Sequence, residues 1–290
     1  MHALLALIPL RRPVVTPAWL SLALFSALVV PATFLPAVLA SESGYTWSLL
    51  VFAVPSLAIA RSLSGHHVLQ RLQRPLLGAW AVLVPMGVVL NLLFADDFFT
   101  YPDGAAVSGL SVPAFDLTGV DWAHPIPLEE FAFYGLGFLT MLLGYAWADE
   151  VLVPLAARVG VRRGAPGWLE AAMAPLALVV AGVVLADGST PSYWTYLSLV
   201  PLPVTLLLWP VVRARLNVPA LLVTMAVLFV SSLVWEAGLA VPRGWWGYQP
   251  DATLGRTLFG VPIEAVVVWV LAPITTAVLF EALRLRRSST

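Results

Sequence analysis

Residues 218–240 read VPALLVTMAVLFVSSLVWEAGLA, and this stretch decides the fold. It carries a single charged side chain, Glu236, near its end. Because the apolar core of a bilayer is about 30 Å thick, a helix needs about 20 consecutive apolar residues to cross it. The stretch therefore predicts a membrane-spanning helix. The composition of the chain agrees, since 60% of its residues are hydrophobic and 11% are charged, against about 25% charged residues in soluble domains.

Other apolar runs lie along the chain near 17–40, 46–60, 75–95, 126–147, 168–186, 191–212 and 260–283. Together with 218–240 they predict an all-α integral membrane protein with about eight transmembrane helices in two four-helix repeats of the same orientation. We expect a cytoplasmic N-terminal segment at 1–16, a first membrane repeat at 17–148, a cytoplasmic linker at 149–167, a second membrane repeat at 168–283 and a basic cytoplasmic tail at 284–290.

The arginines predict the orientation of these helices. With the N-terminus inside, the cytoplasmic segments hold all the arginines except Arg243 and Arg256, and the chain has no lysine. Because cytoplasmic loops are enriched in basic residues, this distribution predicts a plasma membrane protein, in a bacterium an inner membrane protein, with both termini in the cytoplasm. The two outer arginines are expected to pair with acidic residues on their own face.

The composition also excludes several classes of site. The net charge of −1 gives no electrostatic reason to expect a nucleic acid partner. The chain has no cysteine, which excludes disulfides and thiolate metal sites. His66 and His67 are adjacent and His124 stands apart, so no repeated histidine motif predicts a metal centre. The oligomeric state has no signal in the sequence.

Acidic residues gather at the outer face in both halves of the chain. One apolar run ends at Asp96 and the next begins Ile-Pro-Leu-Glu at 126–129; a later run ends at Glu236 and the next begins Val-Pro-Ile-Glu at 261–264. Glu130 follows Glu129 and has no counterpart. Since a carboxylate costs about 2.5–3.5 kcal/mol at the centre of a span and less near its end, we interpret Asp96, Glu129, Glu130, Glu236 and Glu264 as an acidic cavity. The alternative is that Glu129 and Glu264 are helix-start residues favoured by the helix dipole.

These motifs resemble the lycopene cyclase domain family, the flavin-independent membrane cyclases of carotenoid synthesis. In that family an aromatic loop precedes a Pro-x-Glu-Glu motif and a Phe-rich helix, and the domain occurs in two separate polypeptides or fused in tandem. The sequence IPLEEFAFY at 126–134 is similar to this pattern, and WGY at 246–248 with GVPIE at 260–264 forms a looser second copy. The second copy departs from the pattern at Ala265, where the second Glu is missing, and in having valines where the first copy has phenylalanines.

The resemblance implies a carotenoid end-group cyclase that takes an acyclic isoprenoid substrate from the bilayer. Cyclisation needs a proton on the terminal C=C of the ψ-end, attack of an internal double bond on the resulting cation, and loss of a ring proton to a base. No electrons are exchanged, so the resemblance implies no cofactor. Glu129 and Glu264 are expected as acid and base in either order, with Glu130, Asp96 and Glu236 in support. Aromatic side chains are expected to stabilise the cation, by roughly 0.5–2 kcal/mol each: Trp122, Phe133, Tyr134, Trp245, Trp246 and Tyr248.

Other interpretations remain open on the sequence alone. Tryptophan and tyrosine also gather at membrane interfaces without a catalytic role. A carotenoid hydratase shares the first protonation but lets water capture the cation, and a cyclase of another terpene needs the same groups. A transporter also contains repeats, kinked helices and intramembrane acids, although the acids predicted here lie near helix ends.

Overall fold

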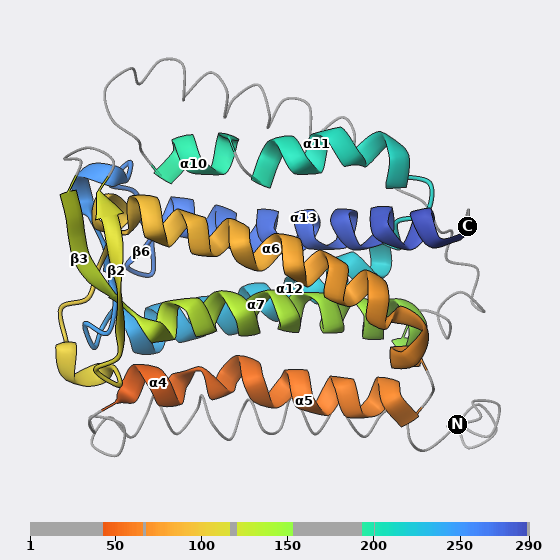
Figure 1. Ribbon diagram of the computed structural model, residues 1–290, viewed down its shortest axis with the longest axis horizontal. Helices are drawn as coiled ribbons and strands as arrows, with labels where there is room; N and C mark the ends of the chain where they lie inside the picture. The colour runs from red at the N-terminus through yellow and green to blue at the C-terminus, as the bar shows by residue number, and fades with distance from the viewer. Residues whose placement is uncertain (1–42, 66–67, 117–120, 153–192, 200, 289–290) are drawn as a thin grey trace, which may run out of the picture.

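The structure is a computed structural model that describes residues 43–65, 68–116, 121–152, 193–199 and 201–288 (Figure 1). The predicted spans at 17–40 and 168–186 and the predicted linker beyond residue 152 lie outside the described residues. The total of eight helices and the repeat arrangement therefore stay predictions.

The described part of the chain is mostly helical. Its helices are α4 (Gly44–Ser48), α5 (Leu50–Gly65), α6 (Val68–Phe98), α7 (Leu128–Trp147), α10 (Tyr193–Leu199), α11 (Pro201–Val212), α12 (Val218–Trp235) and α13 (Ile263–Ser288). Two π-helical segments, η2 (Ala148–Leu152) and η3 (Glu236–Ala240), continue α7 and α12. Within these residues five helical stretches are long and apolar enough to cross a membrane. The predicted membrane character of the chain is thereby confirmed.

The helices lie side by side along their length (Figure 1). Helix α13 packs against α6, α7, α11 and α12, and α7 also packs against α5 and α6. Two pairs of buried hydroxyls join neighbouring helices: Ser56 Oγ lies 2.8 Å from Thr140 Oγ1, and Thr205 Oγ1 lies 2.7 Å from Thr275 Oγ1. Such interhelical hydrogen bonds suit a bilayer, where no water competes for the hydroxyls.

Short strands gather at one end of the helices, and this departs from the all-α expectation. β2 (Ser111–Asp116) pairs with β3 (Asp121–Pro127), β5 (Thr257–Leu258) with β6 (Val261–Pro262), and β1 (Phe99–Thr100) with β4 (Gly247–Tyr248). The 3₁₀ turns η1 (Gly104–Ala106) and η4 (Pro250–Ala252) lie in the same loops. The physical reason is that the loops must pair their own backbone N–H and C=O groups, and periodicity within apolar runs does not report on such short pairings.

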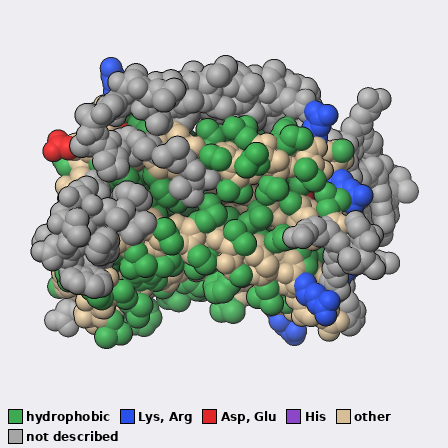
Figure 2. Space-filling model, turned by 45° about the horizontal axis from the view of Figure 1, so that its top comes forward, with side chains coloured by type: hydrophobic (Ala, Val, Ile, Leu, Met, Phe, Trp, Pro, Cys, Tyr) green, Lys and Arg blue, Asp and Glu red, His purple; other side chains and the backbone are tan. Residues whose placement is uncertain are grey.

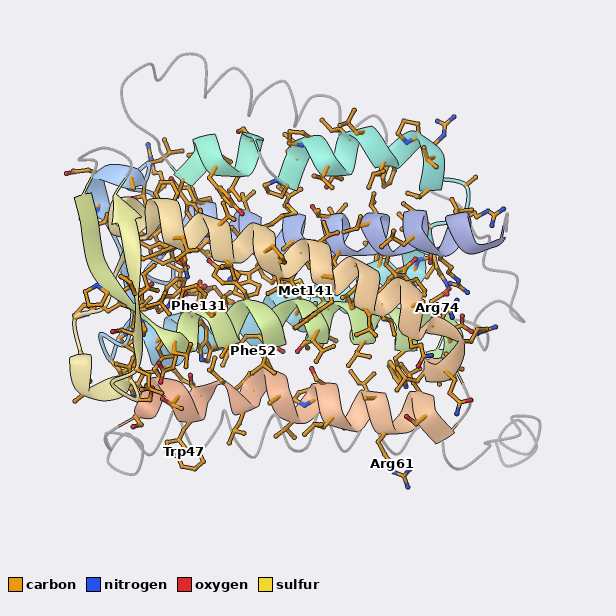
Figure 3. The ribbon with its side chains drawn as sticks, in the orientation of Figure 1. Trp47, Phe52, Arg61, Arg74, Phe131 and Met141 are labelled. Atoms are coloured by element: carbon orange, nitrogen blue, oxygen red, sulfur yellow. The ribbon has the colours of Figure 1, made fainter. Side chains whose placement is uncertain are left out.

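Two hydrophobic cores follow one another along the helices. The core at the strand end is aromatic and includes Phe52, Phe133 and Trp235, whereas the core at the other end is mainly aliphatic. Large apolar side chains also cover the outside of the helices, as Figure 2 shows, and Leu57 and Leu207 are 72% and 77% exposed. Arg61 and Arg74 lie at the end opposite the strands (Figure 3). An apolar belt with basic residues at one end is what a membrane-spanning bundle requires.

Candidate active site

A mainly apolar cavity lies among α6, α7, α10 and α13, next to the strand end. Four small residues line its wall: Gly87, Gly137, Ala265 and Ala272. The carboxyl group that lines this cavity belongs to Glu236, the first residue of the π-helical segment η3. The other lining residues are Leu90, Phe99, Phe133, Tyr134, Phe138, Met141, Tyr193, Tyr196, Leu197, Pro201, Trp246, Val268, Trp269 and Leu271.

The Glu236 carboxyl group is held by one of its two oxygens. Oε1 accepts hydrogen bonds from Trp269 Nε1 at 3.0 Å and from Tyr248 OH at 3.2 Å. Oε2 is buried and has no hydrogen-bond partner, although buried polar atoms are nearly always paired. The side chain lines the cavity and is 1% exposed, so Glu236 combines a place in the cavity wall with an oxygen that has no hydrogen-bond partner.

Tyr248 lies in the loop after η3, and its hydroxyl acts as a donor to this acid. Burial, followed by the neighbouring Glu236 charge, raises the pKa of Tyr248 well above its ordinary value. The hydroxyl therefore keeps its proton and holds the Glu236 side chain in place.

Aromatic rings surround the acid. Phe133 stacks on Trp235 with 5.3 Å between ring centroids, and Trp246 lies 5.0 Å from Tyr248 and 5.1 Å from Phe99. Phe133, Trp246 and Trp269 also line the cavity. Their faces carry negative electrostatic potential, so a cation formed in this cavity would be stabilised without a counter-ion.

Glu129 and Glu264, the two residues expected as acid and base, hold loops. Glu129 Oε1 accepts hydrogen bonds from Ser108 N at 2.7 Å and Thr46 Oγ1 at 2.5 Å. Glu264 Oε1 accepts one from Leu254 N at 2.5 Å. Both amides come two residues after a 3₁₀ turn, η1 or η4, and neither glutamate lines the cavity. Each does keep a buried Oε2 without a partner.

Glu130 is fully buried beside the cavity, and both its oxygens are occupied. Oε1 accepts a hydrogen bond from Tyr45 OH, and Oε2 accepts one from Asn91 Nδ2 at 3.3 Å. Asn91 also accepts a hydrogen bond from Tyr134 OH at 3.4 Å. Because Tyr134 lines the cavity, this chain of hydrogen bonds connects the cavity wall to Glu130.

The remaining predicted residues divide into three groups. Phe133, Tyr134 and Trp246 line the cavity as the cation hypothesis requires. Trp245 lies instead under the Arg243 guanidinium, whose carbon is 5.6 Å from the ring centroid, and Arg243 also donates to Gly238 O. The side chains of Asp96 and Trp122 lie outside the described part of the structure.

Sequence reasoning missed Tyr45, Asn91 and Trp269. A signal existed for Asn91, because a polar residue inside an apolar span marks an interior contact. Tyr45 and Trp269 carried no such signal, since both residue types are common in membrane helices and only the packing brings them to a carboxylate. Within the described residues, His, Asp and Glu side chains form no group of three suited to a metal ion.

One comparison with known proteins finds a relationship. A family model described as lycopene cyclase matches residues 191–283. No curated protein and no solved structure shows significant similarity to the chain. The matched segment supplies α10, α13 and η3, and with them Glu236, Trp246 and Trp269 of the cavity. Residues 191–283, about a third of the chain, are therefore similar to the lycopene cyclase family.

Proposed function

We propose that the chain is a membrane-embedded carotenoid end-group cyclase that works by acid–base chemistry without a cofactor. The observation that carries the proposal is the Glu236 carboxyl group, which lines an aromatic cavity with one oxygen unpartnered. Its place within the family match supports the same reaction class.

In the proposed reaction the protonated Glu236 gives its proton to the terminal C=C of an acyclic ψ-end. The positive charge forms on the neighbouring tertiary carbon, and an internal double bond attacks that carbon to close the ring. Phe133, Trp246 and Trp269 face the positive charge while it exists. The carboxylate left on Glu236 then takes a proton from the ring, so that substrate and product are isomers and the acid is regenerated.

The cavity lining favours cyclisation over hydration. Apart from Glu236, its side-chain hydrogen-bonding groups are the tyrosine hydroxyls and the tryptophan N–H groups. A water molecule inside a protein needs two to four polar partners, and two of these groups, Tyr134 OH and Trp269 Nε1, already donate to Asn91 and Glu236. We therefore expect internal capture by the double bond.

Glu129 and Glu264 have a positioning role in this proposal. Each accepts a hydrogen bond from a loop amide, which keeps the two loops against the helix starts. This differs from the sequence-based expectation, in which these two residues are the acid and the base.

The test is expression in a lycopene-accumulating bacterium, followed by chromatography of the pigments. The parent chain is compared with Glu236→Gln and Glu264→Gln, each quantified in the membrane fraction. We expect a cyclic carotenoid from the parent, no product from Glu236→Gln, and reduced but measurable product from Glu264→Gln. In membranes supplied with unlabelled lycopene in D₂O, one deuterium per new ring would show that the acid exchanges its proton with solvent between turnovers.

Any other result of this experiment would change the proposed function or the proposed acid. A hydroxylated acyclic product would make the chain a hydratase. Unchanged lycopene from well-inserted protein would count against lycopene as the substrate and favour another terpene or a transport function. Full activity of Glu236→Gln would return the acid role to Glu129 or Glu264.

A further inference from the structure

The cavity extends along the helices. On α7 its lining runs from Phe133 through Gly137 to Met141, and on α13 from Ala265 to Ala272. At 1.5 Å per residue the α7 side spans about 12 Å. Figure 3 places Met141 near the middle of the helices, whereas Phe131 lies toward the strand end. We call this cavity the slot: Glu236 lines it, and it reaches from the strand end toward the middle of the helices.

Gly137 borders an empty part of the slot. A methyl group built on its α-carbon would meet no atom of another described element within 4 Å. Gly87, on the facing helix α6, is different, because the Tyr134 ring lies directly on it and a methyl group there would come within 2.2 Å of that ring. The glycine at 87 is thus explained by packing, whereas no described residue fills the space beside Gly137.

Close helix packing does not account for the missing side chain at Gly137 either. Glycines in membrane helices usually allow two backbones to approach each other, but within the described residues no backbone of another helix comes within 4 Å of the built position. Since glycine costs about 1 kcal/mol relative to alanine inside a helix, the open space has a use other than stability.

We infer that Gly137 determines substrate specificity, by leaving room for the polyene chain that follows the reacting end group. The inference rests on the proposed function. With the ψ-end at Glu236, the chain runs past Gly137 to Met141, parallel to the helices, and leaves toward the bilayer interior. The lining beyond Glu236 on this path is apolar, which suits an unsubstituted isoprenoid hydrocarbon and disfavours a chain that carries a phosphate or hydroxyl group near its reacting end.

The experiment places side chains of increasing size at this position. Gly137→Ala and Gly137→Leu are compared with Gly135→Ala, a matched control two residues away. Gly135 lies outside the cavity lining, and a methyl group there makes only an ordinary 3.9 Å contact with Trp80. Purified proteins are assayed with lycopene and with a truncated analogue that has the same ψ-end but ends after the first isoprenoid units.

We expect Gly137→Leu to lower lycopene conversion by about tenfold or more, because the added side chain overfills the slot. Conversion of the truncated analogue should fall much less, and Gly137→Ala should lie between Gly137→Leu and the parent. Gly135→Ala should match the parent with both substrates. A second readout is the amount of lycopene that each protein retains on purification, which does not require turnover.

The outcomes separate this inference from the proposed function. Unimpaired lycopene conversion by Gly137→Leu, or an equal loss with both substrates, would overturn the role of Gly137. Retention of lycopene by the parent but not by Gly137→Leu, with no cyclic product from either, would uphold the slot and reject the cyclase. Equal retention by the parent and Gly137→Leu would reject the slot whatever the parent produces.

Discussion

At the scale of single residues, the position of Glu236 shows what the sequence could and could not predict. Its place at the end of an apolar run identified it as an unusual acid, and the motifs at 126–130 and 261–264 pointed to the same membrane face. Its contact with Trp269 could not be predicted, because it depends on how α12 and α13 are rotated about their own axes. The sequence therefore found the acids and the aromatic residues but not which acid reaches the cavity.

Tyr248→Phe tests how Glu236 is held. The change removes the hydroxyl donor and keeps the ring, while the hydrogen bond from Trp269 remains. Since one hydrogen bond contributes about 0.5–1.5 kcal/mol net, we expect the initial rate to fall roughly three- to tenfold. The measurement is the rate of cyclic product formation per membrane-inserted protein. A loss as complete as that of Glu236→Gln would mean that Tyr248 takes part in the chemistry itself.

At the scale of elements, the first turns of α7 and α13 have the same construction. Each helix begins at the residue that follows the proline of a Pro-x-Glu motif. The glutamate of the motif therefore lies in the first turn, where it accepts a hydrogen bond from a loop amide. The sequence predicted the shared motif correctly. It could not predict the loop amides as partners, because they come from 3₁₀ turns ten or more residues away and those turns have little sequence signature.

Glu264→Gln tests the loop-holding role at this scale. Replacing the carboxylate by an amide weakens a charge-assisted hydrogen bond to Leu254 N, and bonds of that kind contribute about 1.5–3 kcal/mol. We expect a lower unfolding temperature in detergent and a loss of activity that cooling partly restores. Glu236→Gln provides the contrast, since its activity should stay absent at every temperature. An inactive Glu264→Gln protein with unchanged stability would restore Glu264 as a catalytic residue.

The opposite end of the helices is joined by an ion-pair network. Arg284 on α13 contacts Asp149 Oδ2 at 2.8 Å and Glu150 Oε1 at 2.7 Å in η2, and Glu281 Oε1 at 3.2 Å on its own helix. The Asp149 and Glu281 side chains are 10% and 5% exposed. A carboxylate that loses its partner in such surroundings is strongly destabilising.

Arg284→Met should therefore lower the free energy of unfolding by about 3 kcal/mol, with little change in the activity of the protein that remains folded. Arg71→Met is the matched control. Arg71 contacts Glu150 at 2.5 Å, but its side chain is 59% exposed, and exposed pairs contribute less than about 1 kcal/mol. Denaturant titration in mixed micelles measures both variants. Equal losses would show that burial does not set the strength of this network.

At the scale of the whole molecule, the acids of the two halves differ. Glu236 lines the cavity with a free oxygen, whereas both oxygens of Glu130 are occupied and aromatic rings fill the neighbouring space. The motifs at 126–130 and 261–264 predicted that the two halves contribute similar groups to the site. Phe133 in the first motif corresponds to Val268 in the second, and both line the cavity, so the difference in the sequence did not show which acid would lie there.

Because the proposal places a single reacting acid in the slot, it predicts the order in which singly and doubly cyclised products appear. A substrate with two ψ-ends must react at one end, leave the slot and return reversed before the second end can cyclise. We expect a time course in membranes in which a singly cyclised product accumulates first and exchanges with added labelled singly cyclised carotenoid. Direct appearance of a doubly cyclised product, with no exchange, would require a second reacting site.

The pairing of β1 with β4 has a consequence for how such a protein can be divided. Phe99 pairs with Tyr248 and Thr100 with Gly247, and Gln249 N donates to Phe98 O at 2.9 Å. These backbone bonds join segments far apart in the chain, and strand pairing of this kind does not depend on a covalent connection. We therefore expect this pairing to help two fragments associate when the chain is divided within 153–192 and both are produced together. Covalent fusion would then mainly raise the effective concentration of one half near the other, so the same enzyme could be encoded by one gene or by two.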